Sequence, residues 1–234
     1  MKKVLLIGTA VAALMGGSAL AADIPLKAPP QAAAWGWSGF YTGTQAGYGW
    51  GNVDNSFQVV GFSPVPQPAY RISGGVAGSH AVFNLQYGQF VLGFEGDGEW
   101  ANISGNDGGR SGAVDTTTLT WMASARGRVG IAWNQALIYG TGGVAWAGAR
   151  YSLGAGGTNN QLTDTIRGWT AGGGLQWMLS ANWSVRAEYR FTRFDEDSLD
   201  FPAKGIIKAQ TIRFQPDLNV VRVGLSYRWG GGPY

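Results

Sequence analysis

Apolar and polar side chains alternate with a period of two along much of this chain, and the clearest case lies near its C-terminus. In the stretch VRVGLSYRW, residues 221–229, odd positions hold Val, Val, Leu, Tyr and Trp, whereas even positions hold Arg, Gly, Ser and Arg. A β-strand places successive side chains on opposite faces, so one face here is apolar and aromatic and the other is charged or small. A soluble sandwich would bury the apolar face, whereas a membrane barrel would present it to lipid.

Eight alternating segments follow one another, and we expect each of them to be a strand. They are residues 40–51, 75–85, 90–100, 119–131, 138–146, 169–179, 185–191 and 221–229. The connections after the second, fourth and sixth segments are short. The others are expected to be long loops at residues 52–71, 102–118, 151–168 and 195–219. Long connections at one end and short ones at the other are typical of outer-membrane barrels.

Charged residues inside the segments keep to one face. Ten of them share the side opposite the aromatic residues: Glu95, Asp97, Glu99, Arg126, Arg128, Arg186, Glu188, Arg190, Arg222 and Arg228. An arginine facing lipid at the bilayer midplane would cost about 2–4 kcal/mol, so a lipid-facing wall demands this pattern. Tryptophans gather at the segment ends, as in an interfacial aromatic girdle: Trp50, Trp100, Trp121, Trp133, Trp146, Trp169, Trp183 and Trp229. The chain is therefore predicted to be all-β, an eight-stranded antiparallel up-and-down transmembrane β-barrel.

The N-terminus has the features of a secretory signal peptide, which we assign to residues 1–21. Two lysines precede an apolar run that ends before the small-residue site ALA at 19–21. Residues 22–36 are rich in Pro and Ala and are expected to form a periplasmic tether. We expect the barrel at residues 37–229 and a C-terminal tail at residues 230–234. No later apolar run reaches the roughly 18 residues of a membrane helix.

Composition excludes several functions. Removal of the signal peptide leaves 15 basic against 14 acidic residues, so net charge gives no support to binding of nucleic acid or another polyanion. The chain has no cysteine, which excludes thiol nucleophiles and thiolate metal sites. Its many aromatic residues indicate a folded chain and not a disordered one.

The interior of an eight-stranded barrel is just wide enough to be filled by side chains. Seven of the inward charges fall at similar heights and predict a lumen charge belt: Glu95, Asp97, Arg126, Arg128, Glu188, Arg190 and Arg222. Buried charges must pair or stay hydrated. We expect a salt-bridge network across the lumen that closes the barrel, with a narrow charged pore for small solutes as the alternative.

Other candidate chemistry is weak. His80, the single histidine, is expected to point into the lumen as a hydrogen-bonding group, with proton sensing or haem ligation as alternatives. The neighbouring Ser79 points to the opposite face, so no nucleophile–base pair is expected. Residues 172–174 are three glycines without the lysine and helix of a phosphate loop. Residues 195–197 with Asp200 are acidic but lack a known ligand spacing, so a solvated loop is favoured over a cation site. We expect no catalytic residue, metal site or cofactor.

Several segments together resemble the small porin-family outer-membrane proteins known as outer-membrane immunogenic proteins. They are WSGFY at 37–41 with GYGWG at 47–51, GFEGD at 93–97, RGRVG at 126–130, YGTGG at 139–143, NWSVRAEY at 182–189 and VRVGLSY at 221–227. The resemblance implies an OmpA-type barrel with structural or surface-antigen roles, and some members of the family are reported to bind haem. The chain departs from the family at its end, where Trp229 is followed by five further residues, and at Val82, where the family tends to have Gly.

The expected function is that of a non-enzymatic barrel in the bacterial outer membrane, with a filled lumen and surface-exposed loops that contribute to envelope structure and surface interaction. Expected partners are outer-membrane lipid, lipopolysaccharide and the barrel-assembly machinery, with no nucleic acid. The alternatives are a narrow porin for small solutes, or a surface receptor whose loops bind haem or a host-surface ligand. A lipid-modifying enzyme is disfavoured because His80 lacks an expected hydroxyl partner.

Overall fold

A computed structural model describes residues 35–59, 65–108, 114–155, 158–201 and 210–230 of the chain. They belong to one compact unit that spans residues 34–234. The expected signal peptide, most of the expected tether and nearly all of the expected tail lie outside the described residues. No helix within the described ranges is long and apolar enough to cross a membrane.

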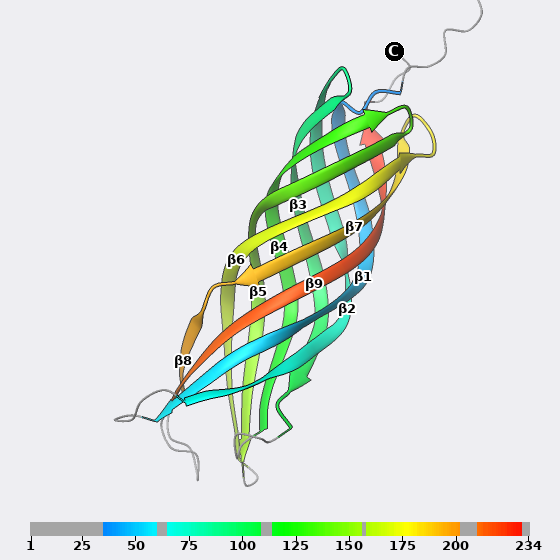
Figure 1. Ribbon diagram of the computed structural model, residues 1–234. Helices are drawn as coiled ribbons and strands as arrows, with labels where there is room; N and C mark the ends of the chain where they lie inside the picture. The colour runs from blue at the N-terminus through cyan, green and yellow to red at the C-terminus, as the bar shows by residue number, and fades with distance from the viewer. Residues whose placement is uncertain (1–34, 60–64, 109–113, 156–157, 202–209, 231–234) are drawn as a thin grey trace, which may run out of the picture. The chain divides into compact units, whose positions relative to one another are not determined.

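The described residues form a closed antiparallel barrel (Figure 1). Its strands are β1 Gly39–Val59, β2 Val65–Tyr87, β3 Phe90–Asn106, β4 Val114–Trp133, β5 Ala136–Ala155, β6 Thr158–Met178, β7 Trp183–Phe194, β8 Asp197–Phe201 and β9 Gln210–Trp229. Each strand from β1 to β6 pairs with the next, β7 pairs with β9, and β9 pairs with β1 to close the sheet. The short strand β8 continues β7 along the same edge of β9. Because β7 and β8 share one position in the wall, the barrel is eight-stranded, and the predicted fold class is confirmed.

The connections at one end of the barrel are short, as predicted. Gly88 adopts a left-handed conformation, with φ of 59°, in the turn between β2 and β3. Asn134 does the same, with φ of 52°, in the turn between β4 and β5. Tight hairpin turns require positive φ, which Gly and Asn tolerate best. We call this end the turn side and the opposite end the loop side.

The prediction of long loops at residues 52–71, 102–118, 151–168 and 195–219 is wrong over most of their length. Strand β1 continues to Val59 and β2 begins at Val65, so only residues 60–64 separate the two strands. The other three hairpins also extend well into the residues assigned to loops. In these extensions Val53 and Ile72 are buried inside the barrel, while Asn52 and Arg71 are exposed. The alternation persists there but its polarity is reversed, because the outer face no longer meets lipid.

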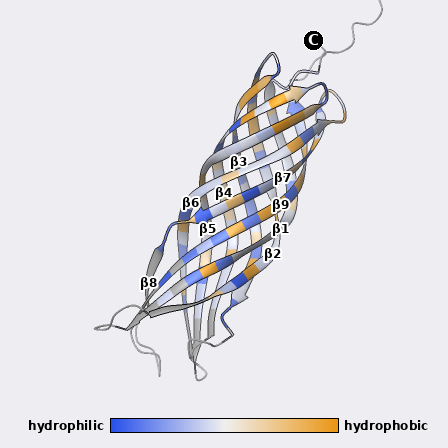
Figure 2. Ribbon diagram, in the orientation of Figure 1, coloured by the Kyte–Doolittle hydropathy of each residue, from blue (hydrophilic) through white to orange (hydrophobic). Residues whose placement is uncertain are grey.

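The lipid-facing wall carries the large apolar side chains. Figure 2 shows apolar and polar residues alternating along individual strands. Trp121 and Trp133 lie on the outer face of β4, twelve residues apart. At about 3.3 Å per residue and the usual strand tilt, their separation along the barrel axis is roughly 30 Å, close to the height of a lipid-facing band with its two girdles.

Candidate functional site: the closed lumen

A network of nine charged side chains crosses the middle of the lumen. It contains the seven predicted residues and two further ones, and we call it the ionic belt: Glu95, Asp97, Glu99, Arg126, Arg128, Arg186, Glu188, Arg190 and Arg222. All nine residues are almost completely buried. Sequence analysis placed Glu99 and Arg186 on the inner face but did not include them in the belt.

Arg222 on β9 is the central cation of the belt. Its guanidinium nitrogens lie 2.7 Å from Glu188 Oε1 and 2.8 Å from Glu99 Oε1. Asp97 Oδ2 is 3.4 Å away and Glu95 Oε1 is 3.8 Å away. Arg222 therefore approaches all four carboxylates of the belt, which come from two different strands.

Arg126 on β4 makes a second set of short ion pairs. Its two terminal nitrogens lie 2.7 Å from Glu95, 2.8 Å from Asp97 and 2.7 Å from Glu188. Glu95 is its neighbour across the β3–β4 ladder, whereas Glu188 belongs to β7. The network thus joins strands that do not pair with one another, and it holds opposite walls of the barrel together.

Two arginines of β7 complete the network across the lumen. Arg190 lies 2.8 Å from Asp97 and 2.7 Å from Glu99 on β3. Arg186 lies 2.7 Å from Glu95 and also donates a hydrogen bond to Gln45 Oε1. Around the barrel, three strands separate β3 from β7 in one direction and three in the other. These contacts therefore span the lumen.

Arg128 is held differently from the other four arginines of the belt. Its guanidinium carbon lies 3.6 Å from the centre of the Tyr139 ring, and it donates a 2.6 Å hydrogen bond to Gln176. The nearest belt carboxylate, that of Glu95, is 3.5 Å away. The planar, weakly hydrated guanidinium suits such stacking on an aromatic face.

Small residues on the inner face provide the space that these long side chains need. A Cβ atom at Gly47 would lie 2.2 Å from the Val221 carbonyl oxygen and 2.8 Å from the Arg222 side chain. A Cβ atom at Gly43 would lie 2.6 Å from the His80 ring. Glycine at both positions therefore allows the belt and its surroundings to fill the lumen.

An apolar cluster closes the lumen on the loop side of the belt. It contains fourteen buried residues, which we call the loop-side cluster: Val53, Tyr70, Ile72, Val76, Ile103, Leu119, Met122, Ala147, Ala149, Tyr151, Ile166, Phe194, Leu218 and Val220. Six of the fourteen lie in residues that were expected to be loops: Val53, Tyr70, Ile103, Tyr151, Ile166 and Leu218. This part of the barrel has the apolar interior of a soluble protein.

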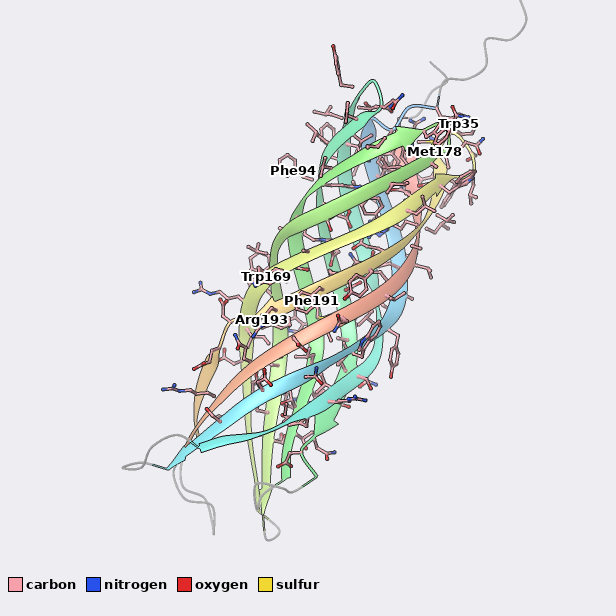
Figure 3. The ribbon with its side chains drawn as sticks, in the orientation of Figure 1. Trp35, Phe94, Trp169, Met178, Phe191 and Arg193 are labelled. Carbon is pink, nitrogen blue, oxygen red and sulfur yellow. The ribbon has the colours of Figure 1, made fainter. Side chains whose placement is uncertain are left out.

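A second apolar cluster closes the turn side and is built around Trp37. It contains Trp37, Val91, Ala132, Leu137, Tyr139 and Met178, and Trp35 packs against it. Figure 3 shows Trp35 and Met178 close to the turns at this end. We call these residues the turn-side cluster. Trp37 is fully buried although it precedes β1, so the chain folds back into the barrel before the first strand begins.

Hydrogen bonds fix the segment that contains Trp37. Its backbone N–H donates to Gln86 Oε1 at 2.6 Å, and its indole N–H donates to the Asn134 carbonyl at 3.3 Å. Tyr41 donates to the Trp37 carbonyl at 3.0 Å, and Arg228 donates to the Gly36 carbonyl. The sequence did not predict this arrangement, because Trp37 lies before the first alternating segment at residues 40–51 and was expected only to begin the barrel.

His80 has a hydroxyl partner, contrary to the sequence-based expectation. Its Nε2 lies 2.8 Å from Ser226 Oγ on β9, while Ser79 is on the outer face as predicted. The pair lies beside the belt with His80 only 4% exposed and Ser226 only 1% exposed. Both side chains are therefore almost completely shielded from water.

The acidic stretch on the loop side is exposed and paired with arginines. Asp195 lies 3.5 Å from Arg167, and Glu196 lies 3.6 Å from Arg213. The side chains of Asp197 and Asp200 lie outside the described residues. Among the described side chains, no group of three or more His, Asp or Glu residues is placed to hold a metal ion.

Residues 172–174, the three consecutive glycines, lie within strand β6, as expected of strand glycines.

A closed antiparallel barrel with an apolar, aromatic outer wall and a charged interior defines an outer-membrane β-barrel protein. The sequence model of the outer membrane protein beta-barrel domain matches residues 9–228, and the chain belongs to that family. It is 33% identical to the 25 kDa outer-membrane immunogenic protein of Brucella abortus, over 97% of this chain and 98% of the relative. It is 29% identical to the 31 kDa outer-membrane immunogenic protein of Brucella melitensis, over 98% of this chain and all of the relative.

The comparison with solved structures supports the fold of this chain and nothing beyond the fold. The outer membrane protease OmpT of Escherichia coli superposes with a TM-score of 0.52 at 9% identity, over 82% of this chain and 97% of that chain. The family and its relatives place the protein in the bacterial outer membrane, where its outer wall meets lipid and lipopolysaccharide.

Proposed function

We propose that this protein is a non-conducting, non-enzymatic barrel that contributes to the structure of the outer membrane and presents its loop side to the outside. The observation that carries the proposal is the filled lumen. The ionic belt occupies the middle, and an apolar cluster covers it on each side. An ion entering from either end would have to pass an apolar cluster before it reached the ionic belt.

The immunogenic relatives support a role at the cell surface. We infer that residues 1–21 direct export and are removed, and that the tether expected at residues 22–36 leads into the barrel, with Trp35 already packed against the turn-side cluster. The interaction partner on the loop side would be recognised by the exposed arginines and acids there, which include Arg167, Asp195, Glu196 and Arg213. A narrow porin remains the competing function, and conductance separates the two.

The test is the single-channel conductance of refolded protein in a planar bilayer, with heat-modifiable migration on a gel as proof of folding. We expect no discrete conductance steps from folded protein, while a general porin incorporated in the same bilayer gives them. Steady steps from verified folded protein would overturn the proposal and make the belt the lining of a small-solute pore. A Trp37→Ala variant is a further test. The ionic belt should keep the barrel non-conducting even when the turn-side cluster is damaged.

A further inference from the structure

The buried charges inside the barrel do not balance. Six arginines of the described lumen are almost completely buried: Arg126, Arg128, Arg186, Arg190, Arg222 and Arg228. Four buried carboxylates accompany them: Glu95, Asp97, Glu99 and Glu188. The other buried carboxylate of the described residues, Asp107, lies beyond the loop-side end of β3. Because an arginine keeps its charge in a protein, the belt and the lumen on its turn side carry an excess of two positive charges.

Arg128 and Arg228 are the least compensated of the six arginines. Each of the other four has a carboxylate oxygen within 2.8 Å. Arg128 reaches only Glu95, at 3.5 Å. Arg228 forms no ion pair with a carboxylate of the described residues, and its guanidinium donates to the Gly36 carbonyl. Since Arg228 is the last residue but one of β9, the uncompensated charge lies on the turn side of the belt.

Asn84 lies beside Arg228 and has no hydrogen-bond partner of its own. Its exposed fraction is 0%, and within the described chain neither its amide nitrogen nor its amide oxygen is hydrogen-bonded. Its register partner on β1 is Gly39, where a Cβ atom would lie 3.5 Å from Cγ and Cδ of Arg228. The Arg228 side chain therefore crosses the backbone next to Asn84. Buried amides in proteins are nearly always hydrogen-bonded, so this amide requires a partner that the neighbouring side chains do not supply.

The surroundings of Asn84 favour an anion as that partner. A cation is repelled by the excess of arginines, and a water molecule would satisfy the amide but leave the charge uncompensated. An anion accepts hydrogen bonds from the amide N–H and from a guanidinium, and Nε of Arg228 also lacks a partner among the described residues. Chloride, a single atom, requires the least space of the abundant anions in a lumen that side chains fill.

We propose that the lumen holds one chloride ion on the turn side of the ionic belt, bound by the Asn84 amide and the Arg228 guanidinium. The ion compensates part of the excess charge and satisfies the buried amide. Gly36, which accepts the hydrogen bond from Arg228, directly precedes the buried Trp37, so the segment that enters the barrel also contacts this site. A resident ion on one side of the belt does not depend on whether the barrel conducts, so the proposal stands apart from the proposed function.

The folding equilibrium of the refolded protein in lipid vesicles tests the proposal. Urea unfolding is measured in mixtures of sodium chloride and sodium gluconate at constant ionic strength, because gluconate is too large for the site. Once chloride exceeds its Kd, each tenfold increase should raise the folding constant about tenfold, as one ion bound by the folded state alone requires. A folding constant that does not respond when chloride replaces gluconate would overturn the proposal.

Two variants assign the effect to this site. Asn84→Asp supplies a fixed negative charge, so it should raise the folding constant about tenfold at low chloride and abolish the chloride dependence. Arg228→Met removes a donor and one excess charge, and it should also abolish the dependence. Asn102→Asp, on the exposed outer surface, is the matched control and should keep the wild-type dependence. An Asn84→Asp protein that fails to fold or is less stable at every chloride concentration would overturn the proposal, as would wild-type dependence in either variant.

Crystals of the protein grown in sodium bromide locate the ion directly, because bromide replaces chloride and scatters anomalously. We expect one anomalous peak in the lumen within hydrogen-bond distance of the Asn84 amide nitrogen and the Arg228 guanidinium, and no such peak in crystals of Asn84→Asp. A lumen without a peak, or a peak that persists in the variant, would contradict the assignment.

Discussion

The same strands build two different interiors in two parts of this barrel. On β1, Tyr48 and Trp50 face lipid, and Gln45 points inward to the ionic belt. Only a few residues later on the same strand, Val53 is buried inside while Asn52 and Asp54 are exposed. The membrane part is apolar outside and charged inside, whereas the loop-side part is polar outside and apolar inside.

The difference shows that strand geometry fixes the alternation and the surrounding medium fixes its polarity. Against lipid, an apolar outer wall is required, and the interior is free to hold charges that pair with one another. Against water, the hydrophobic effect favours a buried apolar interior. The two parts are therefore stabilised by different forces, and substitutions should separate them.

The largest effect is expected from Arg222→Met in the belt. Arg222 approaches four carboxylates, and two of them lie within 2.8 Å. Removing one partner of a buried ion network leaves uncompensated charge and costs about 3–5 kcal/mol. The measurement is the urea midpoint of the barrel in lipid vesicles, followed by tryptophan fluorescence. Arg213→Met, which removes an exposed pair with Glu196, is the control, and equal midpoints for the two variants would contradict the role of the belt.

A similar loss is expected from Leu218→Ala in the loop-side cluster. Leu218 is completely buried, so truncation removes apolar contacts and leaves a cavity, at a cost of about 2–5 kcal/mol. Leu92→Ala on the outer wall should cost less than about 1 kcal/mol, because lipid chains are as apolar as the side chain removed and fill its place. Chemical denaturation of both variants in the same vesicles gives the comparison. If Leu92→Ala were the more damaging change, the loop-side part would not have a protein-like interior.

The boundary between the two parts is tested by placing an arginine on the outer face at two heights. Val223 lies next to Arg222, at the level of the belt, and faces lipid. Val223→Arg should cost about 2–4 kcal/mol, whereas Asn52→Arg above the girdle should cost about 0–1 kcal/mol. Folding yields and unfolding midpoints in vesicles report both values. Similar costs at the two positions would place the membrane surface elsewhere along the strands.

Sequence pattern predicted the barrel because each membrane-facing segment carries its own alternation of aromatic and charged residues. The strand extensions were missed since their outer faces are polar, and a polar residue beside a glycine or proline resembles a loop. A bulge adds to the difficulty: the register shifts around Thr120, so that Leu119 is buried although simple alternation puts Thr120 inside.

Contacts across the lumen were beyond what alternation can specify. Strand parity assigns a side chain to the inner face, but which inward residues meet depends on the tilt and shear of the closed barrel. His80 meets Ser226, which is 146 residues away in the chain, and no local pattern connects the two. Trp37 precedes the first strand, so periodicity contains no signal for its burial in the turn-side cluster.

The smallest effect is expected from Arg167→Ala on the loop side. Its ion pair with Asp195 spans 3.5 Å, and the two side chains are 81% and 61% exposed. An exposed pair of this kind contributes less than about 1 kcal/mol, and about 1 M salt should abolish even that contribution because the Debye length falls to about 3 Å. Unfolding midpoints at low and high salt measure it, and Arg222→Met should lose the same amount at both salt concentrations. A loss for Arg167→Ala that salt does not reduce would mean that this face is shielded from water, and the contrast between a lipid-bounded part and a water-bounded part would then fail at β6.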